Sequence, residues 1–157
     1  MSGILGDKFD IWTDGSFSTA KRVGGAGWVI KQSFKDPIEG KHPIDELHDD
    51  LVPYGSALAE LTAFKKAMAH IPNGAKVHAR MDAQNIIDWL KAKEIKGNPH
   101  AAEALKLTFS MAIYDIARMS SVEFTKVSGR NNEDMQRADE LSKIAKNNAT
   151  HLARIHR

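Results

Sequence analysis

The hydrophobic positions of this chain repeat with a helical spacing in some segments and with a strand spacing in others. In SALAELTAFKKAMAHI, residues 56–71, apolar side chains recur four, three, four and three residues apart, which is typical of one face of a helix. Ser56 stands at the start of this segment and is expected to be its N-cap. In AKVHARM, residues 75–81, apolar and polar residues alternate, which indicates a strand directly after the helix.

Two more strands are expected before this helix. KFDIWT, residues 8–13, is rich in β-branched and aromatic residues, and KRVGGAGWVIKQS, residues 21–33, follows it after a turn. The glycines of the second segment predict that other backbone approaches it closely. Residues 33–54 contain three prolines and many charges, so they predict a long connection with one edge strand.

The rest of the chain is predicted to hold three helices and one strand. The last helix is expected to begin after Asn131 or Asn132, because asparagine is a frequent N-cap, and Glu133 and Asp134 favour the positive end of a helix. The helices are expected over residues 83–95, 100–119 and 131–149, and the strand over residues 122–127.

These elements follow one another in the order β-β-β-α-β-α-α-β-α, which is typical of an α/β fold with a mixed sheet and helices on both faces. The 157 residues contain no internal repeat and no low-complexity linker, and this length fits one domain. We therefore expect a single domain over residues 1–157, with a core over about 8–146 and a basic tail over 147–157.

Composition excludes some kinds of site and leaves others open. The chain has no cysteine, so a disulfide framework, a thiolate metal site and a cysteine nucleophile are excluded. No apolar run approaches the ~20 residues that cross a bilayer, and MSGILGDK has no export signal, so we expect no membrane contact and a cytoplasmic, intracellular location. A net charge of +2 neither demands nor excludes a nucleic-acid partner.

Four acidic residues stand at positions where chemistry is possible. Asp14 is expected to end the first strand, and Asp82 ends the strand of residues 75–81. If these two strands are parallel neighbours, their carboxylates meet at the same edge of the sheet. Glu60 lies at the edge of the apolar face of its helix and Asp139 lies more than one turn into the last helix, so both can lean toward that edge.

Gathering carboxylates in one place has an electrostatic cost. Two unit charges 4 Å apart repel by about 4 kcal/mol at an effective dielectric constant of 20. Such a cluster must either take up protons or hold cations, and carboxylate oxygens favour Mg²⁺ or Mn²⁺. Two such ions ~3.5–4 Å apart can activate a water and stabilise the leaving oxygen in phosphodiester cleavage. Gly15 would permit close approach of backbone or phosphate.

Each acid also has a simpler interpretation. Asp14 before Gly15 and Ser16 is a good turn residue, and Asp82 is a good helix N-cap. Glu60 and Asp139 are compatible with solvated positions on helices. Taken singly, these structural roles are the more common ones, and the joint pattern of four acids is what favours a metal site.

Five short motifs follow one another from about Phe9 to Ala145: TDGS, GGAGWVI, AEL, MDAQ and VSGRNNEDMQRADEL. In these motifs and in their order the sequence resembles type 1 ribonuclease H. This resemblance implies a five-stranded sheet of order 3-2-1-4-5 and a monomeric endonuclease that cuts the RNA strand of RNA–DNA hybrids with two Mg²⁺ ions, for which Mn²⁺ can substitute. Carried over to this chain, the metal ligands and catalytic residues would be Asp14, Glu60, Asp82 and Asp139.

The same resemblance implies contacts to the hybrid. Gly15, Ser56 and Gln84 fall where the family touches its substrate, with Gly15 offering backbone to an RNA 2′-hydroxyl and Gln84 reaching the minor groove. Hybrids are A-like, and their wide minor groove displays the 2′-hydroxyls that distinguish RNA from DNA. Ser16 and Arg130 complete the expected substrate-binding set.

Two departures from the family pattern affect the expected activity. Many members carry a histidine in a V-x-G-H motif, whereas this chain has Arg130 in VSGRNN, in a loop about one residue shorter. Arginine can hold a phosphate but cannot exchange protons near pH 7, so we expect cleavage with slower turnover or a different pH profile. Ser56 and Ala57 stand where many members have asparagine, which bears on contacts to the DNA strand.

Three functions therefore remain open from the sequence. The first is a metal-dependent ribonuclease acting on hybrids, and the second is a non-catalytic hybrid-binding module of the same fold. The third is a structural α/β domain whose acids are coincidental, which predicts neither metal binding nor hybrid affinity. A short basic segment, Trp89 to Lys96, is compatible either with a grip on the DNA strand or with a solvated helix end whose Trp89 joins the core.

Overall fold

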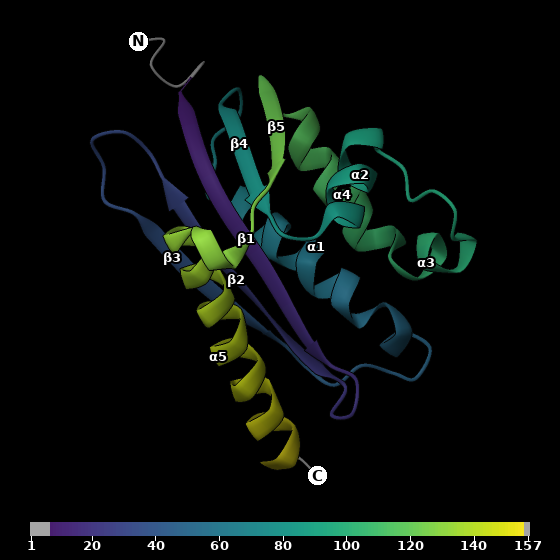
Figure 1. Ribbon diagram of the computed structural model, residues 1–157. Coiled ribbons are helices and arrows are strands. Elements are labelled where there is room, and N and C mark those ends of the chain that lie inside the picture. The colour runs from purple at the N-terminus through teal and green to yellow at the C-terminus, as the bar shows by residue number, and fades with distance from the viewer. Residues whose placement is uncertain (1–6, 156–157) are drawn as a thin grey trace.

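Five strands form one mixed sheet at the centre of the molecule (Figure 1). The computed structural model describes residues 7–155, and the side chains of residues 7–149. The strand order β3-β2-β1-β4-β5 confirms the predicted 3-2-1-4-5 sheet. β1 pairs antiparallel with β2 and parallel with β4, β2 pairs antiparallel with β3, and β4 pairs parallel with β5. The strands are β1 (Lys8–Ser18), β2 (Val23–Lys31), β3 (Ile38–Ile44), β4 (Lys76–Met81) and β5 (Ser121–Lys126).

Helices cover both faces of this sheet, as predicted (Figure 1). α5 packs on one face against β1, β2 and β3, while α1 packs on the other face against β1 and β2 and is itself covered by α4. No helix in the described range is both long and apolar enough to span a membrane. The helices are α1 (Gly55–Met68), α2 (Gln84–Ala92), α3 (Pro99–Ala104), α4 (Lys106–Ala117) and α5 (Glu133–Ile155), with single 3₁₀ turns η1 (Val52–Tyr54) and η2 (Gly129–Asn131).

The sheet separates two apolar clusters. The larger one lies between the sheet and the layer of α1 and α4, and it buries the alternating Val77, Ala79 and Met81 of β4. A smaller cluster joins Trp12 and Val29 of the sheet to three residues of α5, Met135, Ala138 and Leu141. The alternation read from residues 75–81 is therefore the alternation between the core side and the α5 side of the sheet.

Glycines of β2 set the distance between the sheet and α5. A Cβ atom on Gly27 would lie 2.3 Å from the carbonyl oxygen of Ala138, and one on Gly25 would lie 2.1 Å from that of Ser142. Side chains at these two positions would collide with helix backbone, so only glycine lets α5 lie directly on the strand. The predicted close approach of backbone to this strand is confirmed.

Asp14 does not end the first strand, so that prediction is wrong. β1 continues to Ser18 because its pairing with β2 continues, from Asp14 opposite Gly27 to Ser18 opposite Val23. Its parallel pairing with β4 stops earlier, at Trp12 opposite Arg80. Asp14 thus stands in a continuous strand just past the point where β4 leaves it, and the interpretation of Asp14 as a turn residue is also wrong.

Several helix ends differ from the prediction. Ser56 is not an N-cap, because η1 leads directly into α1, which begins at Gly55 without a side-chain cap. The helix expected over 100–119 is divided at the buried Leu105 into α3 and α4. At the start of α5, the side chain of Asn132 accepts a hydrogen bond from the Met135 N–H at 2.9 Å, which confirms one of the two expected caps. Residues 147–155 of the predicted basic tail continue α5, and residues 156–157 lie outside the described residues.

Candidate active site

Four acidic residues from four separate segments come together beside β1. Asp14 lies in β1, Glu60 in α1, Asp82 directly after β4 and Asp139 in α5. Asp14 and Asp82 line two adjoining pockets. Glu60 lines the first, of about 250 Å³, and Asp139 lines the second, of about 290 Å³. The spatial convergence that the sequence pattern predicted is therefore present in the structure.

The supporting elements explain why the acids meet here. Asp82 follows the last residue of β4, where β4 diverges from β1, so it faces the same opening as Asp14. Glu60 reaches the sheet because α1 lies against Gly15, where a Cβ would be 2.4 Å from the backbone carbon of Ala59. Glu60 accepts a hydrogen bond from the Gly15 N–H, and this bond ties the helix to the strand.

Burial and mutual repulsion keep protons in this cluster. Burial, the charge of Glu60 and the nearby carboxyl of Asp139 raise the pKa of Asp14 from 3.8 to about 9. Burial also raises the pKa of Glu60 from 4.5 to about 7, although hydrogen bonds with Asp14 and with the Gly15 N–H act to lower it. Near neutral pH the metal-free site therefore holds a proton on Asp14 that an isolated aspartate would have lost.

Asp139 behaves differently because two cations lie near it. Burial acts to raise its pKa, but the hydrogen bond with Asp14 and the ammonium groups of Lys143 and Lys146 outweigh burial and lower the pKa overall. The Nζ atom of Lys143 is 2.9 Å from Oδ2 of Asp139. Asp139 thus remains a carboxylate, and Lys143 is its counterion in the absence of metal.

The donor set fits a hard divalent cation in its chemistry. All four side chains offer carboxylate oxygens, which Mg²⁺ and Mn²⁺ prefer. Burial is the main cause of the raised pKa values of Asp14 and Glu60, and neighbouring carboxyls raise them further, so a bound cation would oppose both effects. Within the described residues, no three acidic or histidine side chains are already grouped around one point as metal ligands. Asp14 instead holds a proton, and Asp139 forms an ion pair with Lys143. Binding of a cation would therefore require that Asp14 lose its proton.

The proton-holding carboxyls predict a pH-dependent stability of the metal-free protein. The pKa values of Asp14 and Glu60 are higher in the folded than in the unfolded chain, so their contribution to stability is fully present below pH 3.8. It is lost as the pH rises, through about 7 for Glu60 and through about 9 for Asp14. We expect thermal unfolding in a chelator to show this loss, and calorimetry in buffers of different ionisation enthalpy to show proton release when Mg²⁺ is added near pH 7.

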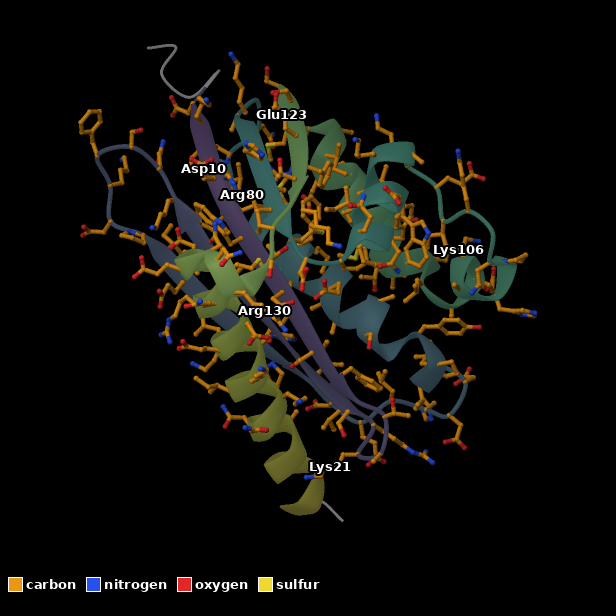
Figure 2. The ribbon with its side chains drawn as sticks, viewed as in Figure 1. Asp10, Lys21, Arg80, Lys106, Glu123 and Arg130 are labelled. Atoms are coloured by element: carbon orange, nitrogen blue, oxygen red, sulfur yellow. The ribbon has the colours of Figure 1, made fainter. Side chains whose placement is uncertain are left out.

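The predicted substrate-binding residues divide into two groups. Gly15 and Ser56 line the pocket that contains Glu60, and Arg130 lines the pocket that contains Asp139. Arg130 lies in η2, beside the N-terminal end of α5 (Figure 2). Ser16 instead points to α5, where its hydroxyl donates to the Ser142 carbonyl at 3.2 Å, and Gln84 donates to Asp88 at 2.8 Å. Neither Ser16 nor Gln84 lines the two acidic pockets.

The structure adds three residues that the sequence interpretation missed. Asn85 lines the pocket of Glu60, and Ser128 lines the pocket of Asp139 while its hydroxyl accepts from the Arg130 N–H at 3.2 Å. Lys143 is the third, and its spacing of four residues from Asp139 on one helix is a signal that sequence reasoning could have used. Asn85 and Ser128 carry no such signal, because their places depend on how α2 and the segment after β5 pack beside the acids.

A five-stranded sheet of this order, with helices on both faces and acids where β1 and β4 diverge, defines a ribonuclease H-like fold. The chain belongs to the RNase H family: the sequence model described as RNase H matches residues 7–147. No protein with a curated description matches the sequence.

Solved structures show the same fold. The N-terminal RNase H domain of rv2228c from Mycobacterium tuberculosis aligns with a TM-score of 0.74 at 16% identity, over 94% of this chain and 99% of that one. RNase H1 from the halophilic archaeon Halobacterium salinarum aligns with a TM-score of 0.69 at 19% identity, over 90% and 99%. LC11-RNase H1, isolated from compost by a metagenomic approach and solved in complex with an RNA/DNA hybrid, aligns with a TM-score of 0.70 at 21% identity, over 90% and 98%.

Proposed function

We propose that this protein is a metal-dependent endoribonuclease that hydrolyses the RNA strand of RNA–DNA hybrids. The observation that carries the proposal is the convergence of Asp14, Glu60, Asp82 and Asp139 at two adjoining pockets in a chain of the RNase H family. The fold alone would not suffice, because one fold hosts many functions. The complex of LC11-RNase H1 with a hybrid supports the choice of substrate.

The four acids are the residues that would hold two Mg²⁺ ions, or Mn²⁺ in their place. When bound, these ions would supply an activated water and a stabilised leaving oxygen for phosphodiester hydrolysis. The protein's own contribution is to keep four carboxyls in one place against their repulsion. It does so by anchoring Glu60 on the Gly15 N–H and Asp139 beside Lys143.

Specificity for RNA is expected from the pocket of Glu60. Gly15, Ser56 and Asn85 line it and suit a minor groove that displays 2′-hydroxyls. Because Glu60 already accepts the Gly15 N–H, the carbonyl oxygen of Gly15 is the backbone group left to accept from a 2′-hydroxyl. On the other side, the exposed guanidinium of Arg130 is suited to hold a phosphate.

A cleavage assay with strand-labelled duplexes tests the proposal. With Mg²⁺, we expect the RNA strand of an RNA–DNA hybrid to be cut, the DNA strand and a DNA–DNA duplex to remain intact, and a chelator to stop the reaction. Hybrid binding without cleavage in either Mg²⁺ or Mn²⁺ would select the non-catalytic module instead. Absence of both binding and cleavage would leave only a structural domain.

Arg130→Gln should weaken hybrid binding without abolishing cleavage. Loss of one charge-assisted phosphate contact is expected to lower affinity by roughly three- to tenfold and to reduce the slope of log affinity against log salt by about one. Fluorescence anisotropy of a labelled hybrid at several salt concentrations measures both. Lys35→Gln, an equal charge change in the exposed loop after β2, is the control and should alter neither. An unchanged salt slope in Arg130→Gln would contradict the phosphate contact.

A further inference from the structure

An open cleft of about 770 Å³ lies along β5, on residues that take no part in the acidic pockets. We call it the β5 cleft. Its long wall is residues 120–125, and the C-terminal ends of α2 and α4 form the opposite side. In Figure 1, β5 is the strand at the edge of the sheet, next to β4, with α2 and α4 beside it.

The two edge strands of the sheet differ in their protection. β3 contains Pro43, which cannot donate to a further strand. β5, with the sequence SVEFTK, has no proline. Within residues 7–155, the backbone of β5 is hydrogen-bonded on the β4 side alone. β5 therefore presents free N–H and C=O groups to the cleft.

The side chains of β5 leave the cleft apolar at its base. The carboxylate of Glu123 is 3.8 Å from Nδ1 of His78, and the hydroxyl of Thr125 is 2.6 Å from Nε2 of the same ring, so both point to the α5 side of the sheet. Val122 and Phe124 alternate with them and pack on the larger core. Apolar side chains of β5, α2 and α4 form the floor of the cleft.

Three charged residues line the cleft, the cations Lys91 and Lys93 and the acid Glu123. Lys91 and Lys93, at the C-terminal end of α2, line it and are exposed. In the described part of the chain neither ammonium group has an acidic partner. The carboxylate of Glu123 points to His78 on the other side of the sheet, so the two lysines give the rim of the cleft a net positive charge.

An apolar stripe on α4 leads into the β5 cleft. Leu107, Met111 and Tyr114 are exposed to 75%, 44% and 70%, and they share one helical face with Ala117, which lines the cleft. Contiguous exposed apolar side chains of this kind are typical of protein interaction surfaces. The stripe therefore extends the cleft into a longer surface.

We propose that the β5 cleft binds an extended, acidic segment of a partner protein, which adds to β5 as a sixth strand. The free strand edge supplies main-chain hydrogen bonds, the apolar floor receives alternate side chains, and Lys91 and Lys93 select acidic flanks. A second copy of this chain fits less well, because it would bring a positive rim against an identical one. A nucleic acid fits the lysines but uses neither the strand edge nor the apolar floor.

Peptide selection on the whole chain tests this proposal. A random twelve-residue peptide library displayed on phage would be selected on the immobilised protein, and the enriched peptides would be synthesised with a fluorescent label. We expect acidic, β-prone peptides that slow amide hydrogen exchange over residues 121–126. Their affinity should fall about tenfold or more in Lys91→Glu/Lys93→Glu, since two rim ion pairs become repulsive.

The matched control is Lys21→Glu/Lys35→Glu, which changes the net charge equally on exposed loops. Lys21 lies at the opposite end of the sheet from Glu123 (Figure 2). Peptide affinity should be unchanged in this control. It should also be unchanged in Asp14→Asn, so the two proposals can fail independently of each other. If the charge-reversed protein is less stable, Lys91→Gln/Lys93→Gln should still weaken binding.

Four results would overturn the proposal. The first is a selection that enriches no acidic peptides, and the second is a bound peptide that slows amide exchange only outside residues 121–126. The third is equal affinity of the peptide for Lys91→Glu/Lys93→Glu and Lys21→Glu/Lys35→Glu, and the fourth is protection of β5 by a dimerisation of this chain that depends on concentration. A loss of hybrid affinity in Lys91→Glu/Lys93→Glu without peptide binding would assign the lysines to nucleic acid.

Discussion

Asp14→Asn is expected to abolish hybrid cleavage while making the metal-free protein more stable. The asparagine side chain keeps the shape of the aspartate but lacks the charge that, in the proposed mechanism, would help Glu60, Asp82 and Asp139 to hold a cation. Since such ions supply several kcal/mol of transition-state stabilisation, the rate should fall by about 10³-fold or more. Single-turnover cleavage of a labelled hybrid at saturating Mg²⁺ measures this loss.

The gain in stability follows from the same residue. In the wild-type protein, folding near neutral pH must force a proton onto Asp14, whose pKa rises from 3.8 to about 9. An amide needs no proton, so unfolding of Asp14→Asn in a chelator should cost more free energy, by an amount on the order of a few kcal/mol. The difference from wild type should grow as the pH rises toward 9 and should shrink when Mg²⁺ is added to the wild type.

Asp36→Asn is the matched control, because Asp36 is exposed in the loop between β2 and β3 and lines neither acidic pocket. It should leave both cleavage and stability unchanged. A lower melting temperature for metal-free Asp14→Asn would show that the aspartate is a structural residue. Wild-type cleavage rates in Asp14→Asn would remove the basis of the proposed chemistry.

Gly27→Ala is expected to have the largest effect on stability. Its methyl group would lie 2.3 Å from the carbonyl oxygen of Ala138 and 2.6 Å from the amide nitrogen of Ser142, both of which are backbone atoms of α5. Rotamer changes cannot relieve such a clash, so α5 must move away from β2. Overpacking in a core typically costs about 1–3 kcal/mol, and we expect about 3 kcal/mol or more here because helix backbone is displaced.

Chemical denaturation of Gly27→Ala measures this loss, and Gly129→Ala is the control, because a Cβ at Gly129 meets no atom within 4 Å. Cleavage should also fall in Gly27→Ala, since Asp139 follows Ala138 on the displaced helix. Unchanged denaturation midpoints would mean that the sheet and α5 tolerate a wider spacing.

Much of the fold could be predicted from local patterns. In α1 and β4 the buried positions repeat with the period of the element itself, so the apolar pattern of the sequence predicted both elements correctly. The glycines of β2 predicted close contact with other backbone, and α5 makes that contact. The start of α5 was also predicted, because the side chain of Asn132 accepts a hydrogen bond from the Met135 N–H and caps the helix.

Features set by strand pairing were harder to predict. The length of β1 depends on β2 continuing beyond the point where β4 ends, which nothing in the segment of residues 8–18 reveals. The break between α3 and α4 falls at Leu105, which is buried and apolar like its neighbours in the predicted helix, so the local pattern does not mark it. The four acids could be chosen by their positions, but Lys143, Asn85 and Ser128 join them only once the chain has folded.

The placement of Asp139 on α5 has a consequence during synthesis. The cluster begins at Asp14 and is completed by a residue in the last fifth of the 157-residue chain. A ribosome must therefore finish nearly all of these residues before the fourth acid reaches its place. A product that stops short of residue 139 would carry three of the acids and no cover for one face of β2, so nascent or truncated forms would lack the complete acidic cluster.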